Sequence, residues 1–125
     1  MNDIYQEELM DILRHPAHKG SLDHPDTTID QANQFCGDLL HLELQIKNSV
    51  ITKAVFRGQA CMVSQLASEI LLDHIEGMMI AEAKALDKEK LLALLQLNLS
   101  TSRIACATLV LKALHQALEN YEKKH

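Results

Sequence analysis

The sequence predicts an α+β fold in which a small three-stranded antiparallel sheet carries helices packed on one face. Two different hydrophobic periods along the chain support this prediction. Between residues 40 and 46 apolar side chains occupy every second position, which is typical of a strand with one buried face. Beyond residue 62 they recur at steps of three and four, which is typical of helices. Because the strands come first and the helices follow, the helices are expected to stack on the sheet.

A short amphipathic helix is expected at the amino terminus, over residues 4–13, where the apolar side chains have helical spacing. Residues 14–26 hold both prolines and one of the four glycines, so they are expected to form a loop. Residues 27–35 are expected to add the third strand of the sheet.

The central hairpin is the clearest part of the sheet. The strand over residues 40–46 is followed by a polar turn at residues 47–49, with the sequence Lys-Asn-Ser. Residues 50–56 are rich in β-branched and aromatic side chains, so they are expected to return as the antiparallel partner.

Helices are expected to fill the rest of the chain. The first follows Cys61, over residues 63–71, and Gly77 is a plausible stop for it. Asp87 is a good N-cap, so it divides the next segment into two short helices. A serine and threonine stretch at residues 100–102 could cap a long last helix. These three later helices are expected at 80–86, 88–97 and 104–121.

Composition excludes several classes of protein. With 47% apolar and 23% charged residues, the 125-residue chain can bury a core, and we expect one domain over residues 1–125 rather than a disordered chain. The formal net charge is −5, and the chain has two Tyr, two Phe and no Trp, so nucleic acid is not an expected partner. No apolar run is long enough to span a membrane and no secretion signal is visible, so we expect a cytoplasmic protein without membrane partners.

The chain has three cysteines, Cys36, Cys61 and Cys106. Their number is odd and a reducing cytoplasm disfavours disulfides, so any role they have is as free thiols, metal ligands or nucleophiles. No Cys-x-x-Cys pair is present. On spacing alone, the common alternative is that each is a small buried apolar residue.

The local context of the cysteines favours a metal site. Cys36 and Asp38 stand two residues apart at the entrance to a strand, so both side chains can face one ion, and Gly37 lets the backbone bend between them. Cys61 lies where a strand gives way to a helix, and Cys106 lies near the start of the last helix. Three thiolates and one carboxylate form a tetrahedral set suited to Zn²⁺ or to iron–sulfur chemistry.

The segments around the cysteines resemble a known family. They read Asn33-Gln34-Phe35-Cys36-Gly37-Asp38, Phe56-Arg57-Gly58-Gln59-Ala60-Cys61-Met62-Val63-Ser64-Gln65-Leu66-Ala67-Ser68 and Arg103-Ile104-Ala105-Cys106-Ala107-Thr108-Leu109. In this order they resemble the three cysteine blocks of the NifU-like iron–sulfur assembly proteins, the IscU and SufU group. The opening segment, residues 5–20, is similar to the amino-terminal helix and loop of that family, so the resemblance covers nearly the whole chain.

The resemblance implies a scaffold or sulfur carrier rather than a stand-alone enzyme, with a metal or cluster site at Cys36, Asp38, Cys61 and Cys106. It implies Zn²⁺ or, alternatively, a labile [2Fe–2S] cluster or iron. The implied partners are a cysteine desulfurase of the SufS or IscS kind and the apoproteins that accept iron–sulfur clusters. Cys36 is the expected acceptor of persulfide sulfur and Cys106 the second choice. Arg103, one turn before Cys106, is expected to stabilise a thiolate or persulfide.

The sequence stands between the two branches of the family. IscU proteins carry a His directly before the third cysteine, where this chain has Ala105, and the Arg103-to-Ala107 context is more like SufU. One alternative is a structural or regulatory zinc-binding module without sulfur transfer. Another is an interaction protein that binds no metal. The seven histidines form no His-x-x-x-His pair, so most are expected to be solvated.

Overall fold

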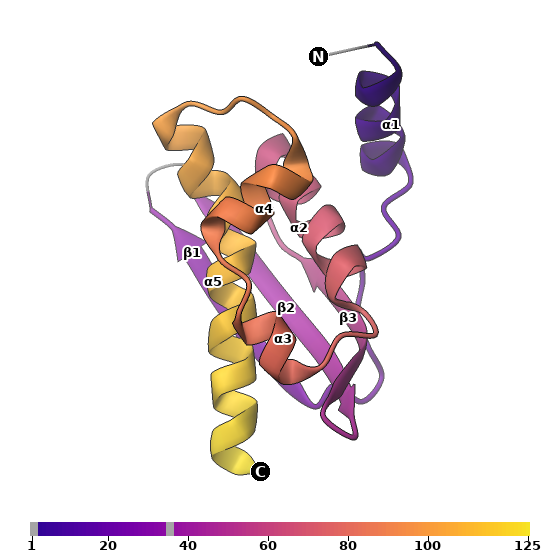
Figure 1. Ribbon diagram of the computed structural model, residues 1–125, viewed down its shortest axis with the longest axis vertical. Coiled ribbons are helices and arrows are strands. Elements are labelled where there is room, and N and C mark those ends of the chain that lie inside the picture. The colour runs from indigo at the N-terminus through magenta and orange to yellow at the C-terminus, as the bar shows by residue number, and fades with distance from the viewer. Residues whose placement is uncertain (1–2, 35–36) are drawn as a thin grey trace.

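The structure is a computed structural model that describes residues 3–34 and 37–125 (Figure 1). It has the α+β fold that the sequence predicts, with a three-stranded antiparallel sheet in the order β1-β2-β3. The elements are α1 (Asp3–Arg14), β1 (Thr27–Asn33), β2 (Asp38–Lys47), β3 (Val50–Arg57), α2 (Met62–Ile75), α3 (Ile80–Lys84), α4 (Lys88–Leu95) and α5 (Thr101–Lys124).

The predicted strands and their turn are confirmed. In the β1–β2 ladder Asn33 stands opposite Asp38, so the connection between these strands lies at one end of the sheet. At the turn between β2 and β3, Asn48 and Ser49 have φ values of 54° and 64°. Two successive positive φ angles suit a tight hairpin, because such a turn follows the right-handed twist of the strands.

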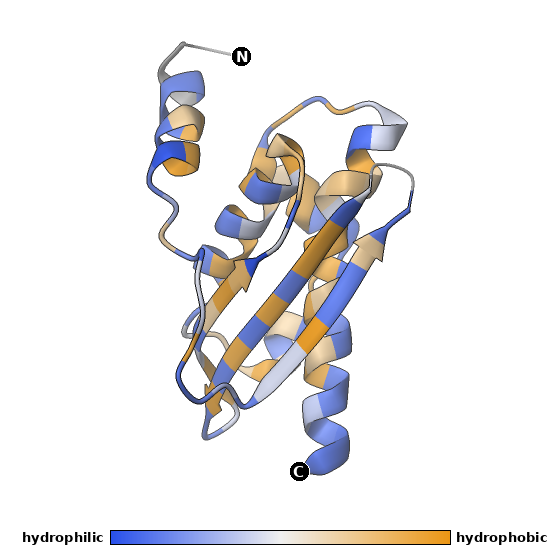
Figure 2. Ribbon diagram, turned by 180° about the vertical axis from the view of Figure 1, so that it is seen from behind, coloured by the Kyte–Doolittle hydropathy of each residue, from blue (hydrophilic) through white to orange (hydrophobic). Residues whose placement is uncertain are grey.

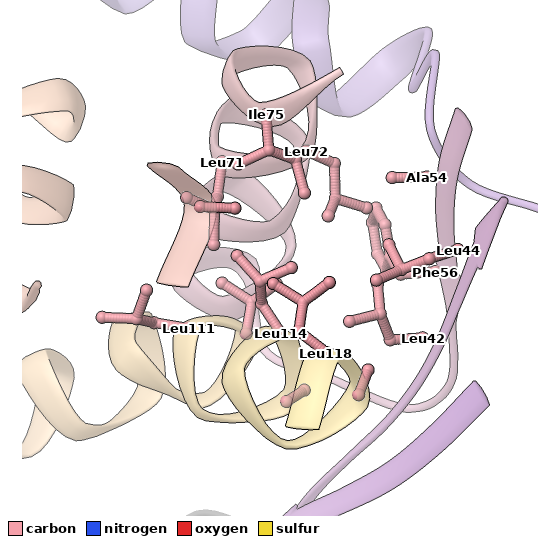
Figure 3. Close-up of a cluster of buried hydrophobic side chains, with 14 of the residues drawn as sticks. Leu42, Leu44, Ala54, Phe56, Leu71, Leu72, Ile75, Leu111, Leu114 and Leu118 are labelled. Carbon is pink, nitrogen blue, oxygen red and sulfur yellow. The ribbon is translucent and has the colours of Figure 1, made fainter. Parts of the chain in front are cut away.

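The core lies between one face of the sheet and the helices (Figure 3). Leu42 and Leu44 of β2 are completely buried, as are Leu71 of α2 and Leu114 of α5. Figure 2 shows the sheet from its other side, where blue and orange residues alternate along β2 and the long helix lies behind the strands. The face of β2 that the period-two pattern assigned to the core therefore packs on helices.

One polar position of β2 differs from the simple alternation. Glu43 alternates with the apolar residues Leu42 and Leu44, so the period of two places it on the solvated face, yet it is 6% exposed. Its carboxylate accepts hydrogen bonds from the backbone N–H of Leu22 at 2.7 Å and from Arg57 at 3.1 Å, and lies 2.9 Å from Nε2 of His41. The loop between α1 and β1 thus covers part of the open face, and these partners compensate the buried charge.

The ends of the helices agree with most of the expected signals. Gly77, at φ 90°, follows the end of α2, and the Asp87 carboxylate accepts a hydrogen bond from the backbone N–H of Lys90 at 2.8 Å. Ser100 is the N-cap residue of α5, but its side chain makes no capping hydrogen bond, so that expectation is wrong in its detail. Among the described residues, no helix is long and apolar enough to cross a membrane.

His18 is an exception to the expectation of solvated histidines, because it is buried in the segment that follows α1. Its Nδ1 lies 3.0 Å from the carbonyl oxygen of Ala54, and its Nε2 lies 3.3 Å from Oδ1 of Asp73. Both facing atoms are acceptors, so the ring satisfies both only when each nitrogen carries a proton. The backbone N–H of His18 also donates to the carboxylate of Glu69. His18 therefore ties the segment after α1 to β3 and α2.

The buried position of His18 makes the free energy of unfolding depend on pH. Burial lowers the pKa of His18, but the Ala54 carbonyl, Asp73, and the charges of Glu76 and Glu69 outweigh it, so the pKa lies above 6.5. The stabilisation is complete below the unfolded-state pKa and is lost as the pH rises through the higher folded-state value. We expect His18→Gln to lower the urea-measured free energy of unfolding more at about pH 6 than at about pH 9. An equal loss at both values would contradict the imidazolium assignment, and the exposed His24→Gln is the control.

Candidate metal centre

Three side chains meet at the end of the sheet where β1 is joined to β2. Asp38 is the first residue of β2, Cys61 is the N-cap residue of α2, and Cys106 lies in the second turn of α5. A carboxylate oxygen of Asp38 and the two sulfurs all lie within 4.8 Å of one another. The structure thus brings together three of the four residues that the sequence indicated. The fourth, Cys36, lies outside the described residues.

Asp38 is fixed by hydrogen bonds from α2. The side chain is 3% exposed. Its Oδ1 accepts from the backbone N–H of Cys61 at 2.9 Å, and its Oδ2 accepts from the hydroxyl of Ser64 at 2.7 Å. A carboxylate at this place also meets the positive end of the α2 dipole. These contacts compensate for the removal of the charge from water and set the orientation of the carboxylate.

Cys61 has the extended backbone of an N-cap residue, with φ −68° and ψ 167°, but its side chain makes no capping hydrogen bond. The residue is only partly buried. Its sulfur is therefore not needed for the helix, whereas its backbone N–H holds Asp38. Cys61 thus places a sulfur at the candidate site, and its backbone N–H holds the Asp38 carboxylate there.

Cys106 is 3% exposed on the inner side of α5. The side-chain amide of Asn33, the last residue of β1, donates to its sulfur with an N···S distance of 3.9 Å. An amide N–H directed at sulfur stabilises negative charge there, as it does for other anions. Asn33 therefore adds a polar contact to the sulfur from β1, a fourth element of the fold.

The backbone at this end of the sheet depends on glycine. Gly58 has φ 135°, and a Cβ there would overlap the carbonyl oxygen of Leu39. The backbone N–H of Leu39 in turn donates to the carbonyl of Gln59 at 2.7 Å. This close approach holds the segment before Cys61 against the start of β2. Gly37 has φ 71°, a left-handed conformation that favours glycine and agrees with the bend expected before Asp38.

Arg103 is exposed in the first turn of α5, one turn before Cys106, as the spacing predicted. Its expected role in stabilising a thiolate or persulfide stays a prediction. Two polar residues of the site were not singled out from the sequence, Ser64 and Asn33. The available signal was weak: Ser64 is a polar residue three positions after the N-cap, and Asn33 ends a strand three positions before Cys36.

The converging atoms fit a metal ion. Two cysteine sulfurs and a carboxylate oxygen are a mixed donor set that Zn²⁺ accepts in tetrahedral sites, and thiolates also hold iron–sulfur clusters. Three donors leave one tetrahedral position to be filled by a further side chain or by a molecule from outside.

The chain is similar in sequence to a known protein family and to several of its members. A family model described as "NifU-like N terminal domain" matches residues 4–125. The "Zinc-dependent sulfurtransferase SufU" of Bacillus subtilis is 25% identical, over 98% of this chain and 94% of its own. The "Iron-sulfur cluster assembly scaffold protein IscU" of Haemophilus influenzae is also 25% identical, over 96% of this chain and 97% of its own.

Among solved structures, the FiSufU protein of the thermophile Fervidobacterium islandicum AW-1 has a TM-score of 0.76, with 22% sequence identity over 92% of this chain and 96% of that one. At this identity the likeness concerns the fold alone. It agrees with the predicted arrangement of the sheet and helices.

Proposed function

Because this chain belongs to the NifU-like N-terminal domain family, we propose that it acts in iron–sulfur cluster assembly, as a scaffold or as an acceptor of persulfide sulfur. The observation that carries the proposal is the meeting of Asp38, Cys61 and Cys106 within 4.8 Å, from three separate elements of the fold. The names of the SufU and IscU relatives, a sulfurtransferase and a scaffold, support the same reaction class.

The proposed centre uses Cys36, Cys61 and Cys106 as sulfur ligands and Asp38 as the oxygen ligand. Cys36 is two residues before Asp38 in the sequence, and Gly37 between them has the left-handed φ of 71° that a sharp bend needs. Zn²⁺ in this set would hold the thiolates deprotonated at neutral pH and would restrain their reactivity until a partner arrives. A labile [2Fe–2S] cluster or iron is the alternative occupant, as cargo.

The sulfur transfer assigned to this centre is a thiol–disulfide type of exchange. The Cys36 thiolate attacks the terminal sulfur of a cysteine persulfide on the desulfurase, and a new S–S bond forms. The S–S bond of the donor breaks, and its cysteine leaves as a thiolate, so no external oxidant is needed. Cys106 is the second candidate, because it is only 3% exposed and its backbone is held in a helix. Arg103 is exposed on α5, one turn before Cys106, and would supply positive charge for a persulfide anion formed at the centre.

A structural zinc module is the second candidate function. The burial of Asp38 and Cys106, at 3% exposure each, favours it, because structural zinc sites are closed on all sides by the protein. In that case the metal would contribute to folding without any transfer of sulfur.

Transfer of labelled sulfur separates the two functions. We expect a cognate cysteine desulfurase supplied with ³⁵S-cysteine to label the wild-type protein, with the label retained on non-reducing gels and removed by a thiol reductant. Cys36→Ser should lose the label and Cys106→Ser should keep most of it. Label lost only in Cys106→Ser would move the acceptor role to that residue. An unlabelled wild type beside an active desulfurase would favour the structural module.

A further inference from the structure

Ser64 contacts two of the candidate metal ligands through its side chain. Ser64 lies on the first turn of α2, one turn after Cys61, and its side chain is 2% exposed. Its hydroxyl lies 2.7 Å from Oδ2 of Asp38 and 2.8 Å from the backbone carbonyl oxygen of Cys106. One hydroxyl therefore faces both the oxygen donor and the segment that carries a sulfur donor.

The two contacts compete for one proton. Both facing atoms are acceptors, and a serine hydroxyl donates only one hydrogen bond at a time. A carboxylate is the stronger acceptor, and 2.7 Å is typical of a charge-assisted O–H···O⁻ bond. The proton therefore goes to Asp38 while that carboxylate carries its full charge. A metal ion bound to Asp38 would draw on this charge, and the Cys106 carbonyl would then be the competing acceptor for the Ser64 proton.

We propose that Ser64 is a positioning residue for the metal centre. It orients the Asp38 carboxylate toward the two sulfurs. Because the Ser64 hydroxyl can donate to the Cys106 carbonyl instead, its hydrogen bond to Asp38 can break and re-form without leaving a buried hydroxyl unpaired. Ser64 thereby sets how firmly the oxygen ligand is held and how readily it exchanges. The inference rests on the proposed metal centre, and it concerns a side chain that touches neither the metal nor the transferred sulfur.

A double-mutant cycle tests this role through zinc affinity, measured by competition with a chromophoric chelator. Partners that orient a metal ligand are worth about 10–100-fold in affinity, so Ser64→Ala should raise the zinc dissociation constant by about 10-fold or more. In an Asp38→Ala background the same substitution should change it by less than about 2-fold, because the carboxylate to be oriented is gone. The visible spectrum of the Co²⁺ form should shift in Ser64→Ala, since an altered oxygen ligand changes the ligand field.

Ser68→Ala is the matched control. Ser68 lies one turn further along α2, is completely buried, and donates to the carbonyl oxygen of Ser64 at 2.8 Å rather than to Asp38. It should destabilise α2 comparably and leave zinc affinity and the Co²⁺ spectrum unchanged. Ser64→Ala with wild-type affinity, or with the same loss in the Asp38→Ala background, would overturn the proposal. A wild-type protein that binds no zinc would instead overturn the metal centre, and with it the basis of this inference.

Discussion

Cys61→Ser is expected to remove metal binding while leaving the fold intact. Loss of a thiolate ligand should weaken zinc binding by more than about 100-fold, because even the outer partners of metal ligands are worth about 10–100-fold. The fold should survive, since serine is a preferred N-cap residue and Cys61 itself makes no capping hydrogen bond. The oxygen of the new side chain could accept from an N–H in the first turn of α2. The metal-free variant should therefore be at least as stable as the metal-free wild type.

The measurement is zinc content by plasma mass spectrometry after purification without an affinity tag, together with urea unfolding of the metal-free proteins. Cys106→Ser should also lose zinc, but its buried position makes a stability loss part of its effect. Full zinc occupancy in Cys61→Ser would remove Cys61 from the centre. If the metal-free Cys61→Ser protein is much less stable than the metal-free wild type, its zinc loss reflects unfolding and not the missing ligand. The urea unfolding data therefore carry the same weight as the zinc content.

Asp38→Ala is expected to retain an assembled [2Fe–2S] cluster longer and to release it more slowly to an apo-ferredoxin. Removal of a weak oxygen ligand from a sulfur-rich site leaves a position that another donor can fill, and this slows exchange. The same substitution takes away the acceptor for the Cys61 N–H, while the Ser64 hydroxyl can still donate to the Cys106 carbonyl. A donor left without a partner costs about 1–3 kcal/mol, so the apo-protein should be less stable while its cluster lasts longer.

Asp38→Asn separates the two effects. An asparagine keeps the shape of the side chain and one carbonyl oxygen for the Cys61 N–H, and its amide can donate to the Ser64 hydroxyl. We expect the apo-protein to keep most of its stability, with cluster release still slowed because the charged oxygen ligand is gone. Faster transfer of the cluster by Asp38→Ala than by the wild type would contradict the role assigned to this carboxylate.

The strands and helices could be predicted because they follow from local pattern. The period of two in β2 and the steps of three and four in α5 record which face each element buries, and these faces meet in the core. The ends of the helices were harder to predict. The α4 helix ends at Leu95, two residues before the expected end, because Gln96 adopts φ 54°. Nothing in the side chain of a glutamine marks it for a left-handed conformation.

The convergence of three candidate ligands could be predicted from the sequence, whereas the contacts that support them could not. Asp38, Cys61 and Cys106 could be singled out because sulfur and carboxylate side chains at element ends are chemically distinctive. Ser64 was not, since serine is common on helices and its role depends on where β2 and α5 pass α2. His18 was missed for the same reason, as its partners Ala54 and Asp73 are more than thirty residues away in the sequence. Long-range packing decides such contacts.

X-ray absorption spectroscopy of the zinc-loaded protein tests the proposed centre most directly, because it counts the atoms bound to the metal. We expect three sulfur neighbours at about 2.3 Å and one oxygen at about 2.0–2.2 Å, from Cys36, Cys61, Cys106 and Asp38. In Asp38→Ala the oxygen contribution should change and the three sulfurs should remain. Fewer than three sulfur neighbours in the wild type, or a spectrum that Asp38→Ala leaves unaltered, would contradict a centre built from three cysteines and this aspartate.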